Sequence, residues 1–410
     1  MISTFLFPNS RWPSLLPLTL LLIVADLQAQ QSASRATSGV PGAHIEEVIV
    51  SATRRDQNSQ QVGISLTAIG RDQLQSPVVR SLPNVELFDD YGGHGMPVWV
   101  IRGVGLQDFN ANNTPTAAVY VDEVYQSSSV QGSSGLFDTE RVEILKGPQG
   151  GLYGRNTSGG VVRQLTARAN LQQQEGYLTL GVGSWDERVL EGAANRPLSD
   201  KLAVRIAGRV NRSHDAWQTS LPSGQKHGEK DLWDVRNWWL LQTSERSRLE
   251  LKLYAGENNS ELPLARSVGL YAADADFCAA ALAGQRDDLQ CLNYAGLVAA
   301  LTGGAASPSP SVQKRDGSTS LSSTLNRLDN SHAGATALLT ADTHWSALGS
   351  PQLQAVSNVE RFDYGLAFDY DGSAAELGHQ ITGSAIRSAS QELRLVSTAS
   401  GPLGWQVGTV

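Results

Sequence analysis

The segment Asp138–Val162, DTERVEILKGPQGGLYGRNTSGGVV, joins a charged, strand-like start to a glycine-rich end. Backbone amides of such loops can cradle phosphate groups, for which a P-loop needs the pattern G-x-x-x-x-G-K-[ST]. Gly154 and Gly159 have the required spacing, but Gly160 and Val161 follow in place of Lys and Ser/Thr. The dinucleotide pattern G-x-G-x-x-G is also missing. We therefore expect a tightly folded connector, because glycine tolerates positive φ and close backbone approach.

The other residues capable of chemistry form no recognisable catalytic or metal-binding set. No nucleophile–His–acid motif is visible, and the seven histidines are scattered without H-x-x-x-H spacing. The formal net charge of −8 disfavours nucleic acid as a partner, since phosphate binding requires a basic face. We expect neither an enzyme nor a protein that holds a metal or a cofactor.

An apolar run near the N-terminus predicts export. Leu15–Ala25, LLPLTLLLIVA, follows Arg11 and is too short for a transmembrane helix, but it suits the core of a signal peptide. We expect residues 1–29 to be a signal peptide cleaved after Ala29, with an uncleaved anchor as the alternative. In an exported chain Cys278 and Cys291 are expected to form a disulfide that closes a short loop. Two free thiols are the alternative.

Residues 30–54 read as a flexible tail that ends in one β-prone run. Gln30–Gly42 is rich in Ser, Ala, Gln and Gly, and HIEEVIVSATR, His44–Arg54, follows it. An isolated run of this kind suits addition as a strand to the sheet edge of another protein. The alternative is the first strand of the next domain.

The remaining chain divides into two regions with different residue patterns. In residues 55–168, Pro97–Gly105, Ala117–Tyr125 and Glu140–Gly147 read as strands of a small α/β domain. In residues 169–410, segments such as KLAVRIAGRVNR and RLELKLYAGE alternate apolar and polar residues over about ten positions, which is typical of outer-membrane β-barrel strands. A soluble β-sandwich also alternates and is the alternative. Barrels of about 22 strands carry a plugged lumen, so the α/β domain is expected inside the barrel.

In this order the segments resemble a TonB-dependent outer-membrane receptor, from about Glu46 to Val410. The resemblance implies a small α/β plug domain followed by a transmembrane antiparallel β-barrel, 22-stranded in the family and incomplete here. EEVIVSA resembles the TonB box, with residues Glu46, Glu47, Val48, Ile49, Val50, Ser51 and Ala52. VIRGVG, VYVDEVY and ERVEILKGPQGGLYGRNTSGG resemble plug motifs, with residues Arg102, Gly103, Asp122, Glu140, Arg141, Glu143, Gly147, Pro148, Gly154, Arg155, Gly159 and Gly160. SQELRL and the following GPLGWQVG resemble a pair of barrel strands.

The chain departs from the family pattern at two positions and in length. Gly151 stands where the family usually has Thr, and Arg163 stands where it usually has Asn. Family members are roughly twice as long, and about nine strand candidates cannot close a 22-stranded barrel. We therefore expect the sequence to be part of a longer protein or a truncated product.

The resemblance implies a transporter in the outer membrane of a Gram-negative bacterium. A scarce ligand, most simply a ferric siderophore that is cargo and not cofactor, would bind from outside, and TonB would pair with the box segment, residues 46–52, as a strand. Arg102, Arg141 and Glu392 are candidates for ion pairs that lock the plug to the wall, for instance an arginine with Glu392.

Tyr91, His94 and Met96 are candidates for the ligand-contacting apex. The alternatives are a non-iron cargo in the same fold, such as a glycan, cobalamin or an aromatic compound, and an inactive truncated fragment. A signalling transducer is disfavoured, because Gln30–His44 leaves no room for a folded domain.

Overall fold

The computed structural model describes residues 49–51, 53–55, 57–58, 62–74, 82–89, 97–106, 111–134, 136–272, 274–285, 290–304, 309–314, 316–322, 326–345, 349–375, 377–397 and 404–410. All of them belong to one unit, Glu47–Val410. The expected signal peptide, four residues of the box segment (Glu46, Glu47, Val48 and Ala52) and the apex candidates Tyr91, His94 and Met96 lie outside the described residues.

The N-terminal region, residues 49–168, is built on a five-stranded sheet in the order β3-β8-β9-β6-β7. Neighbouring strands are antiparallel except β6 and β9, which are parallel. The bounds are β3 Leu66–Gly70, β6 Ala117–Val121, β7 Val124–Gln126, β8 Thr139–Lys146 and β9 Gly160–Thr166. Two short pairs accompany this sheet, β1 Ile49–Val50 with β2 Gln57–Asn58 and β4 Val85–Asp89 with β5 Pro97–Ile101. The helical turns are α1 Arg71–Leu74, η5 Ser129–Ser134 and α2 Gly150–Tyr153.

Both faces of the five-stranded sheet are buried. Ile144 and Leu145 are consecutive residues of β8, point to opposite faces and are both fully buried, in two separate apolar clusters. Val161 and Val162 do the same in β9. A strand covered on both faces reads as a continuous apolar run, which explains why these segments lack alternation.

The glycine-rich segment is the connector from β8 through α2 to β9, as expected. Gly147 has a φ of +99°, which strains any other residue, and its N–H donates to the Gly159 carbonyl at 3.0 Å. Gly160 packs so closely that an added Cβ would collide with the Leu145 carbonyl and lie 2.8 Å from Ile101 Cδ1. The glycines therefore serve a tight return of the chain onto its own sheet.

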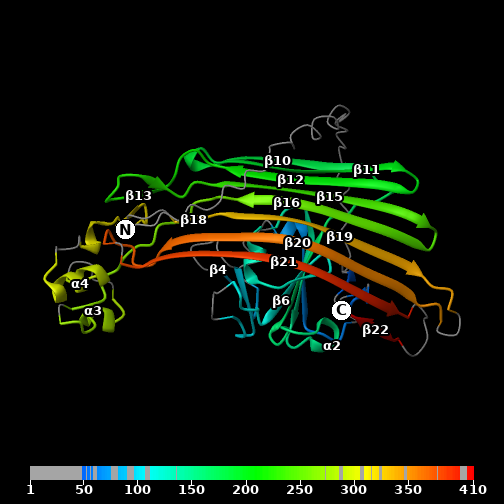
Figure 1. The fold of residues 1–410 in the computed structure, drawn as a ribbon, viewed down its shortest axis with the longest axis horizontal. Coiled ribbons are helices and arrows are strands. Elements are labelled where there is room, and N and C mark those ends of the chain that lie inside the picture. Colours follow the sequence, from blue (N-terminus) through cyan, green and yellow to red (C-terminus); the bar gives the residue numbers. More distant parts are fainter. Residues whose placement is uncertain are drawn as a thin grey trace, which may run out of the picture. The chain divides into compact units, whose positions relative to one another are not determined.

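Most of the later strands form one antiparallel wall sheet, whose strands lie side by side in Figure 1 in the order β10-β11-β12-β15-β16-β19-β20-β21-β22. The bounds are β10 Glu175–Val182, β11 Arg188–Ser199, β12 Leu202–Arg212, β15 Asp231–Ser244, β16 Ser247–Asn258, β19 Asn330–Asp342, β20 Gln352–Asp369, β21 His379–Val396 and β22 Gln406–Thr409. β18 Arg327–Leu328 pairs with β20. The expected pairing of the SQELRL strand with the following segment is confirmed as β21 with β22. Within the described residues, no helix is long and apolar enough to cross a membrane.

The wall sheet exposes apolar side chains and buries polar ones, which is the reverse of a sheet in a soluble protein. In β16, Leu249, Leu251 and Leu253 are 37%, 36% and 42% exposed, whereas the intervening Glu250 and Lys252 are only 5% and 4% exposed. A β-sandwich buries its apolar face, so the sandwich alternative is wrong. An apolar exterior around a polar interior is the architecture of a transmembrane β-barrel.

Long connections join the strands at one end of the wall sheet. The longest lies between β16 and β19 and holds α3 Ala279–Leu282, α4 Tyr294–Thr302 and η7 Pro310–Val312. The Asn293 side chain caps α4 by accepting from the Gly296 N–H at 2.7 Å. β13 Gln218–Ser220, β14 Lys226–His227 and β17 Thr319–Ser320 form a small sheet, and η6 Ser184–Asp186 lies between β10 and β11.

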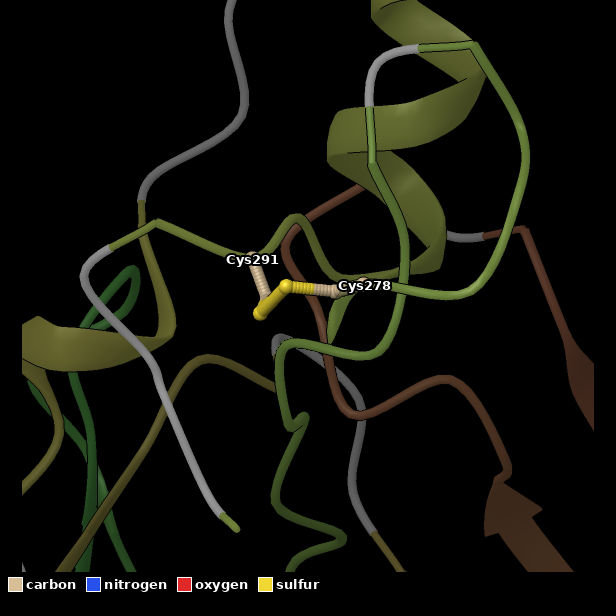
Figure 2. The surroundings of a disulfide bond; sticks show 2 residues. All are labelled: Cys278 and Cys291. Atoms are coloured by element: carbon tan, nitrogen blue, oxygen red, sulfur yellow. A yellow bond between two sulfur atoms is a disulfide. The ribbon is translucent and has the colours of Figure 1, made fainter. Parts of the chain in front are cut away.

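The Cys278–Cys291 disulfide is formed, with its Cα atoms 5.7 Å apart (Figure 2). Cys278 is the N-cap of α3, and Cys291 is buried. The bond closes a loop within the insert, which has few long strands to hold it.

The reversed polarity makes a testable prediction at two exposed leucines. Leu251→Arg places a charge on the apolar face of β16. We expect this change to make folding into lipid vesicles less favourable by about 2–4 kcal/mol. Leu301→Arg, at a 60% exposed position of α4, is the matched control and should change stability by less than about 0.5 kcal/mol. Urea titration of the complete receptor to which this chain belongs, folded in vesicles, measures both. Equal effects would contradict a lipid-facing β16.

Candidate functional site: the interface between the N-terminal region and the wall sheet

A tight turn carries two acids from the N-terminal region to the wall sheet. The segment Ala117–Tyr125, expected as one strand, is a hairpin in which β6 and β7 are joined by Asp122 and Glu123 alone. Their φ angles are +48° and +75°, as a two-residue hairpin of this kind requires. Non-glycine residues adopt this conformation at a cost, which the contacts of the two carboxylates offset.

Asp122 is fully buried and joins the turn to both β9 and β16. Its carboxylate accepts from the Thr166 N–H at 2.8 Å and from Lys252 Nζ at 3.0 Å. The Trp238 indole N–H donates to Thr166 Oγ1 at 3.0 Å and extends the contact to β15. Burial raises the pKa of Asp122, but the positive charges of Lys252 and its neighbouring arginines outweigh burial, so the pKa lies below its ordinary value. The carboxylate is therefore charged and paired.

Glu123 is shared by three arginines from three parts of the chain. Arg54 and Arg163 make short ion pairs with its two oxygens, and Arg394 Nη2 of β21 donates to Oε2 at 3.2 Å. Burial raises the pKa of Glu123, but the positive charges of Arg163, Arg54 and Arg394 lower it well below the ordinary value. One carboxylate thus connects the tail after the box segment, strand β9 and the wall.

The end of the box segment is fastened to the same network. Val50 is fully buried in the N-terminal core, and the Ser51 N–H donates to Glu143 Oε1 at 3.0 Å. Arg163 Nη1 donates to Ser51 Oγ at 2.8 Å and to Glu143 Oε2 at 2.6 Å. Arg163, which replaces the family's usual Asn, therefore bridges Ser51 to both Glu143 and Glu123.

Another buried acid, Asp138, contacts strands β12 and β15 of the wall. Asp138, with a φ of +42°, precedes β8 and accepts from Arg205 Nε at 2.9 Å and Nη2 at 2.5 Å. Arg236 of β15 donates to the Phe137 and Asp138 carbonyls, and its guanidinium lies 4.3 Å from the centre of the Phe137 ring. Both arginines come from the polar face of the wall, as alternation predicts.

The expected lock residues are placed differently from the prediction. Arg141 pairs with Glu140 and Glu143 inside the N-terminal region, and Arg102 is exposed in the turn after β5, with its N–H donating to the Asn84 carbonyl at 2.9 Å. Among the described residues, Glu392 forms ion pairs with Arg54 at 4.0 Å and Arg394 at 3.1 Å. An arginine does lie at Glu392, but it is Arg54 and not Arg102 or Arg141.

The other motif residues lie near the connector. Gly103 has a φ of +77° beside Arg102, Pro148 follows Gly147, and Arg155 lies 5.7 Å from the Tyr125 ring centre. Sequence reasoning missed Glu123, Asp138 and Arg54 as interface residues, because a positive φ and a shared carboxylate leave no spacing pattern. Arg163 was visible as a departure from the family.

Loss of the Arg163 charge should destabilise the N-terminal region. Arg163→Met removes a buried partner of both Glu123 and Glu143. We therefore expect the free energy of unfolding to fall by about 3–5 kcal/mol. Arg188→Met is the control, because Arg188 pairs with Asp186 in an exposed site and such pairs contribute about 0–1 kcal/mol. Hydrogen exchange of the β8 and β9 amides in the full chain reports both. Unchanged protection in Arg163→Met would refute the bridging role.

Acidification should weaken the same network. A carboxyl group with a lowered folded-state pKa stabilises the fold above its unfolded pKa, about 4.3, and this stabilisation disappears as the pH falls through the folded-state pKa. We expect the stability of the N-terminal region to be level from about pH 7 to 5 and to fall below that. Glu123→Gln should be less stable than the unmodified chain at pH 7. Its stability should also fall less than that of the unmodified chain as the pH is lowered. Glu140→Gln, at an exposed site, should follow the unmodified chain in a urea and pH titration.

Known proteins share both parts of this architecture. Residues 58–161 match the family described as TonB-dependent Receptor Plug Domain. The ferrienterobactin receptor of Escherichia coli (strain K12) is 27% identical over 312 residues, which cover 62% of this chain and 38% of that protein. The vitamin B12 transporter BtuB of Vibrio vulnificus (strain YJ016) is 26% identical over 197 residues, which cover 45% of this chain and 30% of that protein. The chain thus spans about a third of the length of these relatives.

Solved structures of the same fold extend the likeness to the wall sheet. The ferric yersiniabactin uptake receptor FyuA from Yersinia pestis superposes with a TM-score of 0.58 at 18% identity, over 84% of this chain and 47% of that one. The ferripyoverdine receptor of the outer membrane of Pseudomonas aeruginosa superposes with a TM-score of 0.55 at 14% identity, over 85% of this chain and 41% of that one. The chain therefore contains a plug domain of the TonB-dependent receptor family and has the fold of such a plug followed by part of a β-barrel.

Proposed function

We propose that this chain is the plug-bearing part of an outer-membrane receptor that imports a ferric siderophore with energy supplied through TonB. The observation that carries the proposal is the plug domain held against a barrel wall by buried charges. Two of the relatives are a ferrienterobactin receptor and a pesticin receptor, and the superposable structures include ferric yersiniabactin and ferripyoverdine receptors. The protein would reach the outer membrane of a Gram-negative bacterium after cleavage of residues 1–29.

The contacts of the box segment suggest how ligand binding from outside could control the pairing of this segment with TonB. Val50 is buried and Ser51 is held by Glu143 and Arg163, so a partner strand cannot pair there until these contacts open. Ligand bound from outside would favour the open arrangement, and TonB would then add the freed segment to its own sheet through main-chain hydrogen bonds. A ligand shifts such an equilibrium only by its differential affinity for the two states.

Tyr91, His94 and Met96 remain our proposed ligand-contacting apex. They lie in one glycine-containing stretch before β5, and an aromatic ring, an imidazole and a thioether can contact a chelate. The proposal fails if uptake by a Tyr91→Ala, His94→Ala, Met96→Ala variant equals that of the unmodified receptor.

A cobalamin-type cargo is the second candidate, because two relatives are vitamin B12 transporters. The two candidates separate in cells that lack their own receptors and carry the complete receptor to which this chain belongs. Growth with ferric siderophores as the sole iron source supports the first, whereas growth that depends on vitamin B12 supports the second. Growth with neither, while the receptor is present in the outer membrane, would refute both.

A backbone change in the box segment should stop transport but not binding. Val50→Pro removes one N–H that strand pairing requires, so we expect loss of labelled-iron uptake with ligand still bound at the cell surface. Val50→Ile keeps the N–H and is the matched control, with uptake within about twofold. Normal uptake by Val50→Pro would contradict strand addition at this segment.

A further inference from the structure

We infer that a cavity between the plug and the wall binds a polyanionic chelate bearing two or more carboxylate groups. Its volume is about 490 Å³, within the size range of small-molecule pockets. The assignment of this anion as cargo rests on the proposed function, whereas the anion site itself rests on the cavity.

The cavity lies at the end of the wall where the connections are short. Its wall residues come from the start of β16, the end of β19, the start of β20 and the end of β21, next to the 244–247, 343–351 and 397–405 connections. Its plug residues include Ser51 and Arg54, so an occupant would lie beside the end of the box segment. The long insert that carries the disulfide joins the opposite ends of β16 and β19.

Arginine outnumbers acid in the lining. The cavity is lined by six arginines and three glutamates: Arg54, Arg55, Arg141, Arg168, Arg248 and Arg394, with Glu123, Glu140 and Glu250. Glu123 serves both Arg54 and Arg394, as well as the adjacent Arg163. Including the adjacent Arg163, Glu143 and Glu392 gives seven arginines against five glutamates, so positive charge still exceeds negative charge.

One buried donor in the lining lacks an acceptor. Arg54 is 5% exposed, and its Nε has no hydrogen-bond partner among the described residues. Arg168 and Arg248 share Glu250 at 3.3 Å and 3.6 Å. Buried guanidinium groups without enough acceptors are costly, and an anion of charge −2 or −3 would supply the missing ones.

The lining also selects the class of anion. Leu338, Val356 and Val396 add apolar surface beside the guanidinium groups. Planar guanidinium forks match carboxylate oxygens in pairs, so an organic polycarboxylate or its iron complex fits better than a neutral ligand or a cation. For an imported anionic chelate, the cavity would be a holding site between the plug and the wall.

Titration calorimetry on the full chain in detergent tests this assignment, with citrate, ferric citrate and inorganic pyrophosphate as probes. We expect one saturable site for citrate and ferric citrate, weakened by added salt. Arg248→Gln should raise the Kd about tenfold, which is the loss of about one charge-assisted contact. Arg248→Lys keeps the charge and should recover most of the affinity.

Arg188→Gln is the matched control. Arg188 and Arg248 are both mostly exposed and each pairs with an acid two positions away, but Arg188 lies outside the cavity lining. Unchanged affinity in Arg188→Gln, together with weakening in Arg248→Gln, supports the assignment. It is overturned if citrate does not bind, if both variants bind alike, or if pyrophosphate alone binds, which would make this a phosphate site.

The binding result and the uptake result are separable. Binding of citrate at the cavity without TonB-driven uptake by the complete receptor refutes the proposed function and leaves the anion site standing. Uptake of a ferric siderophore without citrate binding overturns only the cavity assignment.

Discussion

Charges enclosed between the plug and the wall must find partners, and this constraint organises the molecule. A barrel wall faces lipid with leucine and valine, so its polar side chains point inward, toward the plug. Lys252 and Arg205 are nearly fully buried and meet Asp122 and Asp138 of the plug. Removing one partner leaves an uncompensated buried charge, so each of these ion pairs ties the plug to the wall. The buried charges of the wall therefore require the acids of the plug as partners, and the acids of the plug require the charges of the wall.

The sequence predicts the elements of this arrangement better than their contacts. Alternation placed Leu249, Leu251 and Leu253 on one face and Glu250 and Lys252 on the other, and the structure has these faces. Period-two patterning is a local property, so it can be read directly from the residues. Ion pairs across the interface join residues as far apart as Glu123 and Arg394, and no local pattern encodes them.

Strain explains where sequence reasoning failed. Asp122, Glu123 and Asp138 all have positive φ and all contact several partners. An expectation based on β propensity makes Ala117–Tyr125 one strand, because valine and tyrosine dominate it. The turn forms instead, because it delivers Asp122 to Lys252 and Glu123 to three arginines, all of which would otherwise lack these partners. Tertiary electrostatics thus overrode local preference at the positions that join the two parts.

The pairing of the box segment has a mechanical consequence. Among the residues that the structure describes, β1 pairs only with β2, in a two-stranded sheet separate from the five-stranded sheet of the plug. Tension applied at the N-terminal side would peel two residues from a short ladder, without shearing β3, β8 or β9. The load would then pass through Ser51 to the Arg163 side chain, which is anchored in β9. The β1–β2 pairing thus yields first and the side-chain contacts of Ser51 second, and the five-stranded sheet begins to bear force only after both have broken.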